Sequence, residues 1–342
     1  MPTSHNIIQE LPILVLNVHS RCNCRCVMCD IWKRETSTEL RVSDLVPHRE
    51  AWRRLNVRWV VLSGGEPLLH SDLSALCNLF RQDGIRLTLL TTGLLLSKRA
   101  SEVATLFDEV IVSLDGPQHI HDSVRRVNGA YRLIVQGVQA LRALRAEIRI
   151  SARTTVQKSN FRLLRETVES AKQIGVDSIS FLAADLTSEA FNRPQQWSRA
   201  RQSEIALTAA DVSELDHEIG QLISTYTSEI ASGFIAESPT KLRKIATHFK
   251  AHLGLANESA PICNAPWNSA VIEADGSVRP CFFHRVIGNI REQPLDQVLN
   301  SPQALAFRNA LDIETNPICR RCVCSLNCTE GKKQSLLTIA EA

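Results

Sequence analysis

The feature that most constrains the fold is a regular alternation of strand-like and helix-like segments over the first half of the chain. Short runs rich in Val, Ile and Leu are separated by longer stretches with amphipathic spacing, and this rhythm is typical of parallel βαβ units. The predicted strands are 13–18, 57–63, 86–92, 109–114, 147–155 and 177–182. The predicted helices are 42–55, 72–83, 98–106, 131–144 and 161–174. The pattern predicts an α/β chain whose residues 10–186 form a partial (β/α)6, TIM-like barrel.

The rhythm stops after Leu186. The polar stretch 188–203 contains Pro194 and is typical of an exposed connection, and amphipathic helices are predicted at 207–232 and 239–253. In the remainder, 270–281 is typical of a β-hairpin that turns at an Asp-Gly pair. We therefore expect a linker with helices over 187–255 and a small α+β domain over 256–330.

Charge and hydropathy exclude several partners. The 342 residues include 39 Lys and Arg and 36 Asp and Glu, so a net charge of +3 predicts no nucleic acid partner. No apolar run reaches the roughly 18 to 20 residues of a membrane span, and the first ten residues lack a secretory pattern. We therefore expect a cytoplasmic protein without a membrane span. In such a reducing compartment the 11 cysteines favour metal ligation or catalysis over disulfides.

Three cysteines follow the first predicted strand in a C-x3-C-x2-C arrangement, Cys22, Cys26 and Cys29. Three thiolates from one loop can ligate three irons of a 4Fe-4S cube and leave the fourth iron open to a small molecule. A structural zinc site or an electron-carrier cluster would require a fourth ligand, which Cys24 is badly placed to supply. The spacing therefore favours an open 4Fe-4S cluster.

This arrangement, with the apolar Met28 before the last cysteine, resembles the signature of the radical S-adenosylmethionine (SAM) superfamily. The resemblance implies that the open iron chelates the amino and carboxylate groups of SAM. It also implies that one electron, supplied by a reducing flavodoxin or ferredoxin, cleaves SAM to a 5'-deoxyadenosyl radical. The radical would then abstract hydrogen from a peptide or a small molecule, which is oxidised or rearranged.

A second motif, Gly64-Gly65-Glu66-Pro67, ends the second predicted strand and resembles the family's G-G-E-P sequence. Consecutive glycines let the backbone come close to a ligand, and the Glu66 carboxylate could accept hydrogen bonds from the ammonium group of SAM. An ordinary tight turn is the alternative.

Further candidates lie at the ends of later strands, where α/β barrels carry their active sites. By resemblance, Ser113 would contact the cofactor. Arg153 is a candidate partner of the cofactor carboxylate, with a surface ion pair as the alternative. Leu182 could contact adenine or simply belong to the core. Asp185 is the candidate catalytic acid or base, with a solvent-exposed loop carboxylate as the alternative.

The C-terminal cysteines form C-x12-G-x4-C and C-x2-C-x5-C patterns, which resemble the SPASM or twitch extension of radical SAM enzymes. A second full cluster would need a further cysteine where Lys332 stands, so one auxiliary 4Fe-4S cluster is expected. A zinc ribbon is the alternative. The expected ligands are Cys263, Cys281, Cys319 and Cys322, with Cys328 as an alternative ligand.

Other residues bear on the activity and on which side chains are structural. Phe282 follows Cys281 where the sulfatase-maturing relatives have an aspartate base, which disfavours that activity. Cys77, His121 and His284 are expected to be structural. A non-catalytic iron-sulfur carrier stays as the alternative from another class of protein, and a small alcohol or sugar is an alternative to a peptide substrate.

Overall fold

One nine-stranded sheet forms the centre of the computed structural model, which describes residues 6–193 and 195–328. The strands lie in the order β6-β5-β4-β3-β2-β1-β7-β8-β9, and β6 to β7 run parallel. All six strands expected in the barrel are present, within about two residues of their predicted bounds. The strands are β1 Ile13–His19, β2 Trp59–Gly64, β3 Arg86–Thr91, β4 Glu109–Ser113, β5 Arg149–Val156, β6 Ser178–Ala183, β7 Ser269–Ile272, β8 Ser277–Arg279 and β9 Gly288–Asn289.

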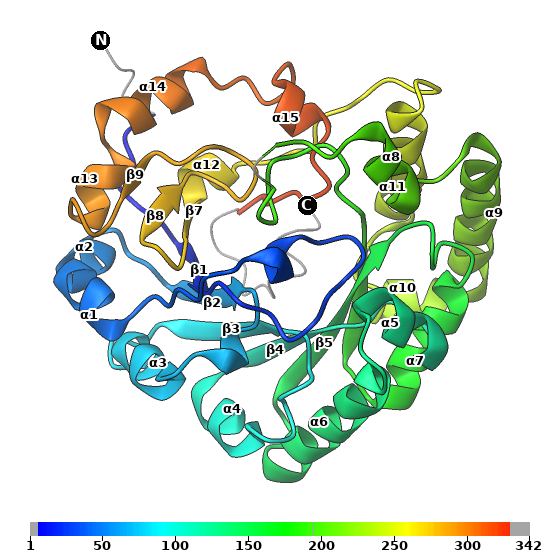
Figure 1. Cartoon of the computed structure of the whole chain (residues 1–342), viewed down its shortest axis with the longest axis horizontal. Helices are drawn as coiled ribbons and strands as arrows, with labels where there is room; N and C mark the ends of the chain where they lie inside the picture. Colours follow the sequence, from blue (N-terminus) through cyan, green and yellow to red (C-terminus); the bar gives the residue numbers. More distant parts are fainter. Residues whose placement is uncertain (1–5, 194, 329–342) are drawn as a thin grey trace.

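Helices follow the outer rim of this sheet (Figure 1). The predicted helix 42–55 is broken into three short pieces at Pro47, whose ring cannot continue a helix. The rim helices are α1 Val42–Leu45, α2 Arg49–Arg54, α3 Leu73–Arg81, α4 Ala100–Leu106, α5 Gln118–Arg125, α6 Ala130–Leu144 and α7 Leu164–Ile174. The later helices are α8 Arg199–Ile205, α9 Ala209–Thr225, α10 Thr227–Ser232, α11 Pro239–His252, α12 Ala265–Asn268, α13 Leu295–Leu299, α14 Pro302–Ala310 and α15 Pro317–Arg320.

Both faces of the parallel sheet are apolar, as expected for a sheet covered on both sides. Alternate residues such as Leu14 and Val60 join the large core under the helices. Their neighbours Ile13 and Trp59 form a smaller cluster on the opposite face, together with Ile111. This alternation explains why near-continuous apolar runs in the sequence predicted the strands correctly.

The C-terminal hairpin continues the barrel sheet. Strand β7 pairs in parallel with β1, from Ile13 opposite Ser269 to Leu16 opposite Ile272, and β8 returns antiparallel to β7. Gly276, at φ +83°, takes the left-handed conformation that the tight turn requires. The predicted hairpin is confirmed, but its strands are part of the same sheet as the barrel.

The prediction of an exposed connection over 188–203 is confirmed in part, because Gln195, Gln196 and Arg199 are exposed but two large side chains are not. Trp197 and Arg193 are buried, at 8% and 3% exposure, and helix α8 begins within this stretch. Arg193 is buried because its guanidinium finds partners in Asp185 and in the Met28 carbonyl of the cysteine loop. Composition alone could not predict this burial, since it counts polar groups without their partners.

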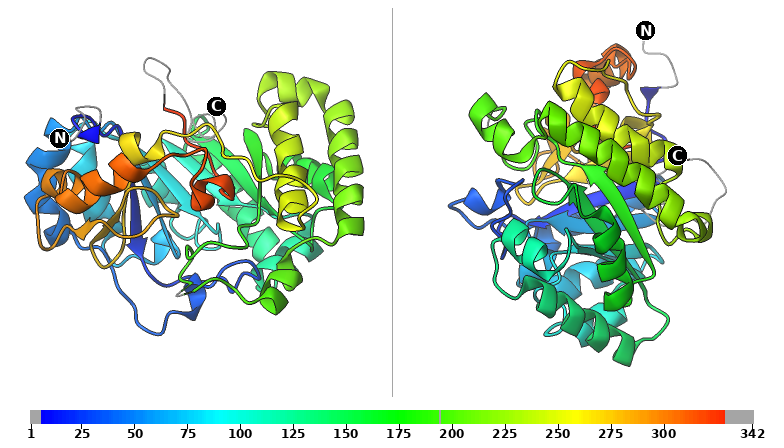
Figure 2. Two further views of the ribbon diagram at one scale, coloured as in Figure 1. Left: turned by 90° about the horizontal axis from the view of Figure 1, so that it is seen from above. Right: turned by 90° about the vertical axis from the view of Figure 1, so that its right-hand side faces the viewer.

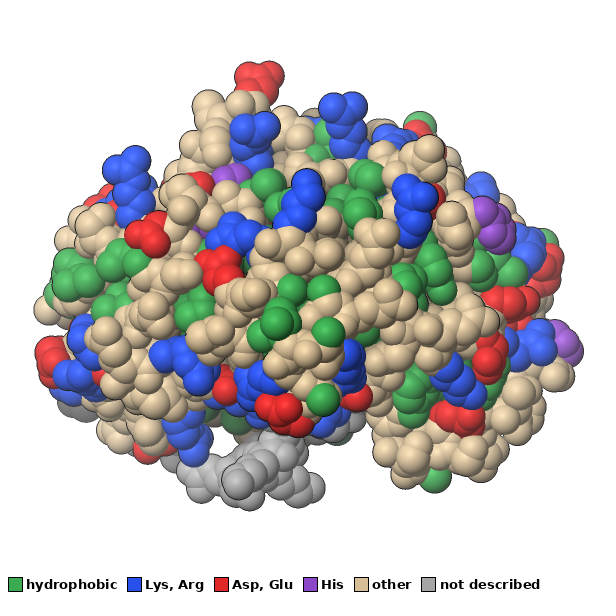
Figure 3. Space-filling view, turned by 90° about the horizontal axis from the view of Figure 1, so that it is seen from below, with side chains coloured by type: hydrophobic (Ala, Val, Ile, Leu, Met, Phe, Trp, Pro, Cys, Tyr) green, Lys and Arg blue, Asp and Glu red, His purple; other side chains and the backbone are tan. Residues whose placement is uncertain are grey.

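Beyond β6, helix α11 packs on both β6 and α9 (Figures 1 and 2). No helix among the described residues combines the length and apolarity needed to cross a membrane. On the face shown in Figure 3, basic and acidic side chains are interspersed and form no broad patch of one sign. The expected absence of a nucleic acid partner and the cytoplasmic location stay predictions.

Candidate active site and cysteine clusters

The loop that leaves β1 carries Cys22, Cys26 and Cys29 and is fixed by its backbone. The amides of Arg25 and Val27 donate to carbonyls at the end of α5, at 3.1 and 3.0 Å. The three cysteines pack with Leu94 and Ala130 in one apolar cluster. Three thiols on one loop at the carboxyl end of β1 fit the donor set that an open 4Fe-4S cluster requires.

Cys24 has a position that the sequence did not indicate. It is buried, at 1% exposure, and its thiol lies within hydrogen-bonding reach of the Cys22 and Cys26 thiols. Hydrogen bonds to these two thiols, followed by burial, raise the pKa of Cys24. The hydrogen bond from Cys24, together with the charge of Arg125, lowers the pKa of Cys26 to about 7 despite its burial. Cys24 therefore supports the thiolate form of a neighbour.

A buried ion pair stands directly behind Cys26. The Nη1 of Arg125 lies 3.5 Å from the Cys26 sulfur, and its Nε donates to Asp115 at 2.6 Å. The side chains of Arg125 and Asp115 are 9% and 0% exposed. Asp115 follows β4 and Arg125 ends α5, so two barrel units hold one guanidinium against the sulfur. The sequence does not indicate this role of Arg125, because only the fold brings it to the cysteine loop.

The contact between Arg125 and the Cys26 sulfur predicts an effect on the reduction potential of the N-terminal cluster. An N–H donor and a positive charge next to a ligating sulfur stabilise the reduced cluster and raise its potential. We expect Arg125→Met, combined with Asp115→Asn so that no buried charge is left unpaired, to lower the potential of the N-terminal cluster. The expected shift is on the order of 60 mV, which is tenfold in a one-electron equilibrium. The measurement is a potentiometric titration followed by electron paramagnetic resonance without SAM.

Arg126→Met is the matched control, since Arg126 is exposed and adjacent in sequence. Its potential should equal that of the unmodified protein. Equal potentials in the double variant and the unmodified protein would contradict the proposed tuning.

The glycines of Gly64-Gly65-Glu66-Pro67 are required by the protein backbone. A Cβ on Gly65 would lie 2.0 Å from the Arg21 carbonyl oxygen, and one on Gly64 would lie 2.7 Å from that of His19. The Gly65 amide donates to the backbone carbonyl of His19 at 2.8 Å. Both glycines therefore lie against the start of the cysteine loop, and their expected approach to a ligand stays a prediction. The motif therefore fixes where that loop begins.

Glu66 is fully buried and already engaged. Its carboxylate accepts from the Leu68 amide at 3.0 Å, the Thr91 hydroxyl at 2.8 Å, and the Thr92 amide and hydroxyl at 2.7 and 2.6 Å. Burial raises the pKa of Glu66, and these hydrogen bonds oppose the rise. An ionised carboxylate has about four acceptor sites. The geometry thus gives Glu66 a positioning role between β2 and β3, and its expected contact with an ammonium group stays a prediction.

The other predicted cofactor contacts lie at the carboxyl ends of their strands. Ser113 ends β4 and is paired in register with Arg153 on β5, which in turn is opposite Ser180 on β6. The Nε of Arg153 donates to Ser180 at 3.2 Å, and no carboxylate pairs with Arg153 within the described ranges. Arg153 is therefore suited to an anionic ligand, and the alternative of a surface ion pair finds no partner there. Leu182 is partly exposed near the same end of β6.

Asp185 forms a buried ion pair that the sequence did not reveal. Its carboxylate accepts from Nη1 of Arg193 at 2.6 Å, with the side chains 4% and 1% exposed. The same guanidinium donates to the Met28 carbonyl at 3.3 Å and lies 3.6 Å above the Trp197 ring, whose Nε1 donates to Asp30 at 2.6 Å. Asp185 is therefore neither a solvent-exposed loop carboxylate nor a free base. This geometry favours a role in holding the segment around Cys29.

The four expected auxiliary ligands approach one another in the C-terminal region. Cys281 and Cys319 both interact electrostatically with Cys263, and Cys322 interacts with Cys281 and Cys263. Burial raises the pKa of Cys281 to about 12 and that of Cys319 to about 11. Four thiols gathered from separate segments fit a cluster site. Within 6–193 and 195–328, no three His, Cys, Asp or Glu side chains are arranged to hold a single metal ion.

His284 lies beside this group of thiols, whereas Cys328 does not. The Nε2 of His284, expected to be structural, lies 3.4 Å from the Cys319 sulfur. Cys328 instead packs against the cluster of Ile13 and Trp59 on the sheet, and its backbone exchanges hydrogen bonds with the Asn264 side chain at 2.8 and 2.9 Å. The structure does not bring Cys328 to the other four thiols. Lys332 lies outside the described residues.

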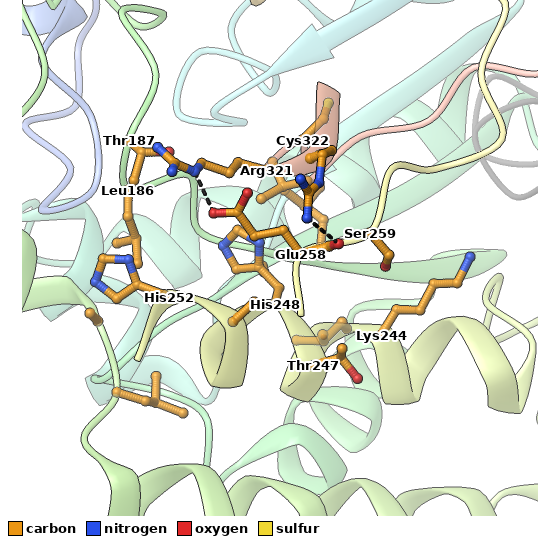
Figure 4. Close-up of a pocket in the computed structure, with 18 of the residues that line it drawn as sticks. Leu186, Thr187, Lys244, Thr247, His248, His252, Glu258, Ser259, Arg321 and Cys322 are labelled. Carbon is orange, nitrogen blue, oxygen red and sulfur yellow. Dashed lines mark hydrogen bonds and ion pairs between the residues drawn. The ribbon is translucent and has the colours of Figure 1, made fainter. Parts of the chain in front are cut away.

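A cavity of about 1260 Å³ opens beside the C-terminal cysteines (Figure 4). It is bounded by the end of β6, by α8, by α11 and by the segments 257–262 and 320–325. Leu182, Trp197, His248 and Cys322 are among its lining residues. Because Trp197 also bonds to Asp30, the cavity lies one side chain away from the N-terminal cysteine loop.

Comparisons with known proteins agree with this architecture. Residues 16–171 match the family model of the radical SAM superfamily, and residues 263–323 match the SPASM iron-sulfur cluster-binding domain. Pre-heme d1 synthase of Dinoroseobacter shibae is 33% identical over 170 residues, which is 48% of this chain and 42% of that enzyme. AdoMet-dependent heme synthase of Methanosarcina barkeri is 27% identical over 313 residues, 86% of this chain and 82% of that enzyme. Among solved structures, Streptococcus suis SuiB bound to SAM has a TM-score of 0.65 at 16% identity, with 94% of this chain and 74% of that chain covered.

Proposed function

The chain belongs to the radical SAM superfamily and carries a C-terminal SPASM domain, and on this premise we propose that it is an enzyme that oxidises a tetrapyrrole. Its cofactors are SAM and iron-sulfur clusters. Bound at the open iron, SAM supplies a 5'-deoxyadenosyl radical that can abstract a hydrogen atom from the substrate. This proposal narrows the expected substrate from a peptide or any small molecule to a tetrapyrrole.

The observation that carries the proposal is the size and chemistry of the cavity beside the cysteine clusters. Its volume of about 1260 Å³ exceeds the usual range of roughly 300–1,000 Å³ for small-molecule sites, so it suits a large ligand. Two of the relatives named above are a pre-heme d1 synthase and an AdoMet-dependent heme synthase, and both names refer to tetrapyrroles. The likeness to SuiB, at 16% identity, concerns the fold and does not favour a peptide substrate.

The chain's own residues have separable roles in this proposal. Cys22, Cys26 and Cys29 hold the N-terminal cluster, and Arg153 with Ser113 faces the carboxylate end of SAM. Cys263, Cys281, Cys319 and Cys322 hold the auxiliary cluster, which accepts the second electron of the oxidation. The Asp185–Arg193 pair positions the Cys29 segment. We expect a reduced flavodoxin or ferredoxin to supply the first electron.

The test uses anaerobically reconstituted protein with dithionite, SAM and a panel of propionate-bearing iron porphyrins, beginning with iron(III) coproporphyrin III. We expect 5'-deoxyadenosine to form faster with a tetrapyrrole than without one, and the porphyrin mass to change. Unchanged 5'-deoxyadenosine formation and unchanged mass across the panel would reject the tetrapyrrole. Absence of 5'-deoxyadenosine under all conditions would match the non-catalytic carrier.

A further inference from the structure

We infer that the cavity between β6, α8 and α11 binds an iron-bearing, carboxylate-rich macrocycle, with its carboxylates on Lys158, Arg199 and Lys244 and its iron on Nε2 of His248. This inference rests on the tetrapyrrole proposed above and specifies where and how it binds. Figure 4 shows the α11 side of the cavity, where Lys244, His248 and His252 project from one helix.

The charge of the cavity favours an anionic ligand. Six Lys or Arg side chains line it against one carboxylate, that of Glu258, among the described residues. Glu258 is already paired with Arg321 at 2.6 Å. Within the described chain, no carboxylate pairs with Lys158, Arg199 or Lys244. Several separated cations facing one space match a ligand with several carboxylates better than one with a single anionic group.

The remaining lining is largely apolar. Leu186, Leu207 and Ile245 are buried core residues that also border the cavity, and Trp197 contributes an aromatic face. A site with an apolar wall and charged groups around it suits a broad ring system with charged substituents at its periphery. Small acids would leave this wall exposed to water.

His248 adds a donor for a metal ion within the ligand. Its Nε2 is buried and has no hydrogen-bond partner in the described chain, whereas its ring bonds to the Ala184 carbonyl. Because Nε2 has no partner, we assign the N–H that faces this carbonyl to Nδ1, and this tautomer leaves a lone pair on Nε2. A histidine that ligates metal characteristically donates its other ring N–H to such a carbonyl. Burial also lowers the pKa of His248 to about 4, so the ring is neutral near pH 7.

Access to Nε2 depends on the neighbouring Glu258–Arg321 pair. Glu258 lies beside the His248 ring (Figure 4), and the two paired side chains are 25% and 46% exposed. Long, partly exposed side chains can change rotamer at small cost. The proposal therefore includes displacement of this pair when the macrocycle enters.

The first experiment tests the carboxylate contacts by fluorescence titration with metal-free coproporphyrin III and with its tetramethyl ester. We expect the free acid to bind and the neutral ester to bind weakly. Lys158→Gln with Lys244→Gln should weaken binding of the acid roughly tenfold. Arg243→Gln is the control, because Arg243 lies on α11 but does not line the cavity. Equal binding of acid and ester, or no effect of the double variant, overturns the assignment of the carboxylates.

The second experiment tests the iron ligand by difference absorption and electron paramagnetic resonance spectra of the protein with iron(III) coproporphyrin III. We expect the unmodified protein to give the spectrum of an imidazole-ligated iron porphyrin. His248→Ala should lose that spectrum, regain it with added imidazole, and still bind the metal-free porphyrin. His252→Ala, on the next turn of the same helix, should keep it. An unchanged spectrum in His248→Ala overturns the ligand assignment.

Both experiments measure equilibrium binding without SAM, so they are separable from the proposed function. Tetrapyrrole-dependent 5'-deoxyadenosine formation combined with failed binding tests would reject this site and retain the substrate class. Failure of both would reject the substrate class itself.

Discussion

Replacing Cys26 by alanine is expected to abolish SAM cleavage and to halve the iron content of the reconstituted protein. Cys26 is one of three thiols on the loop after β1, and a cube held by two thiolates would not retain its iron. With one auxiliary cluster, the iron content should fall from about eight to about four atoms per chain. Iron analysis and quantification of 5'-deoxyadenosine give the two readouts.

Cys77→Ala is the matched control for this variant. Cys77 is a fully buried residue of α3 in the main core, so its thiol is remote from iron chemistry, as the sequence predicted. The control should keep both the iron and the activity at a modest cost in stability. Persistence of 5'-deoxyadenosine formation in Cys26→Ala would show that this loop does not hold the SAM-cleaving cluster.

Replacing Arg193 by methionine is expected to cause a large loss of stability. The variant leaves the Asp185 carboxylate buried and unpaired, at 4% side-chain exposure, and removes a donor from the Met28 carbonyl. Removal of one partner from a buried pair costs roughly 3–5 kcal/mol. The free energy of unfolding, measured anaerobically by denaturant titration, should fall by about that amount.

Two comparisons separate this effect from a general loss of an arginine. Asp185→Leu combined with Arg193→Met should cost less than Arg193→Met alone, since no charge is left buried. Arg54→Met should change stability by less than about 1 kcal/mol, because the Arg54–Asp296 pair is 61% and 27% exposed. Equal losses in Arg54→Met and Arg193→Met would contradict the buried-pair interpretation.

The sequence was sufficient where local pattern determines structure. Val60 and Leu62 belong to an apolar run whose length and flanking residues predicted β2 correctly, and Asp275-Gly276 predicted the turn between β7 and β8. Cysteine spacing alone placed Cys22, Cys26 and Cys29 on one loop. These features depend on neighbours in the chain, which a sequence displays directly.

The features that the sequence did not predict depend on contacts between distant segments. Trp197 reaches Asp30 across 167 positions, and Arg125 reaches Cys26 across 99. Composition indicated an exposed, polar stretch around Arg193, because the partners that make its burial favourable lie elsewhere in the chain. The hydrogen bonds that Glu66 accepts were not predictable for the same reason, since Thr91 and Thr92 belong to another strand and the residue after it.

The pairing of β7 with β1 limits where the chain can be truncated. Strand β1 reads Ile-Leu-Val-Leu-Asn-Val-His, and without β7 its unsatisfied amides and carbonyls would form a long apolar sheet margin open to other chains. With the hairpin in place, the edge strand on this side of the sheet is β9, which is only two residues long. We therefore expect the SPASM region to protect the barrel from aggregation, and a truncation before it to yield a fragment prone to self-association.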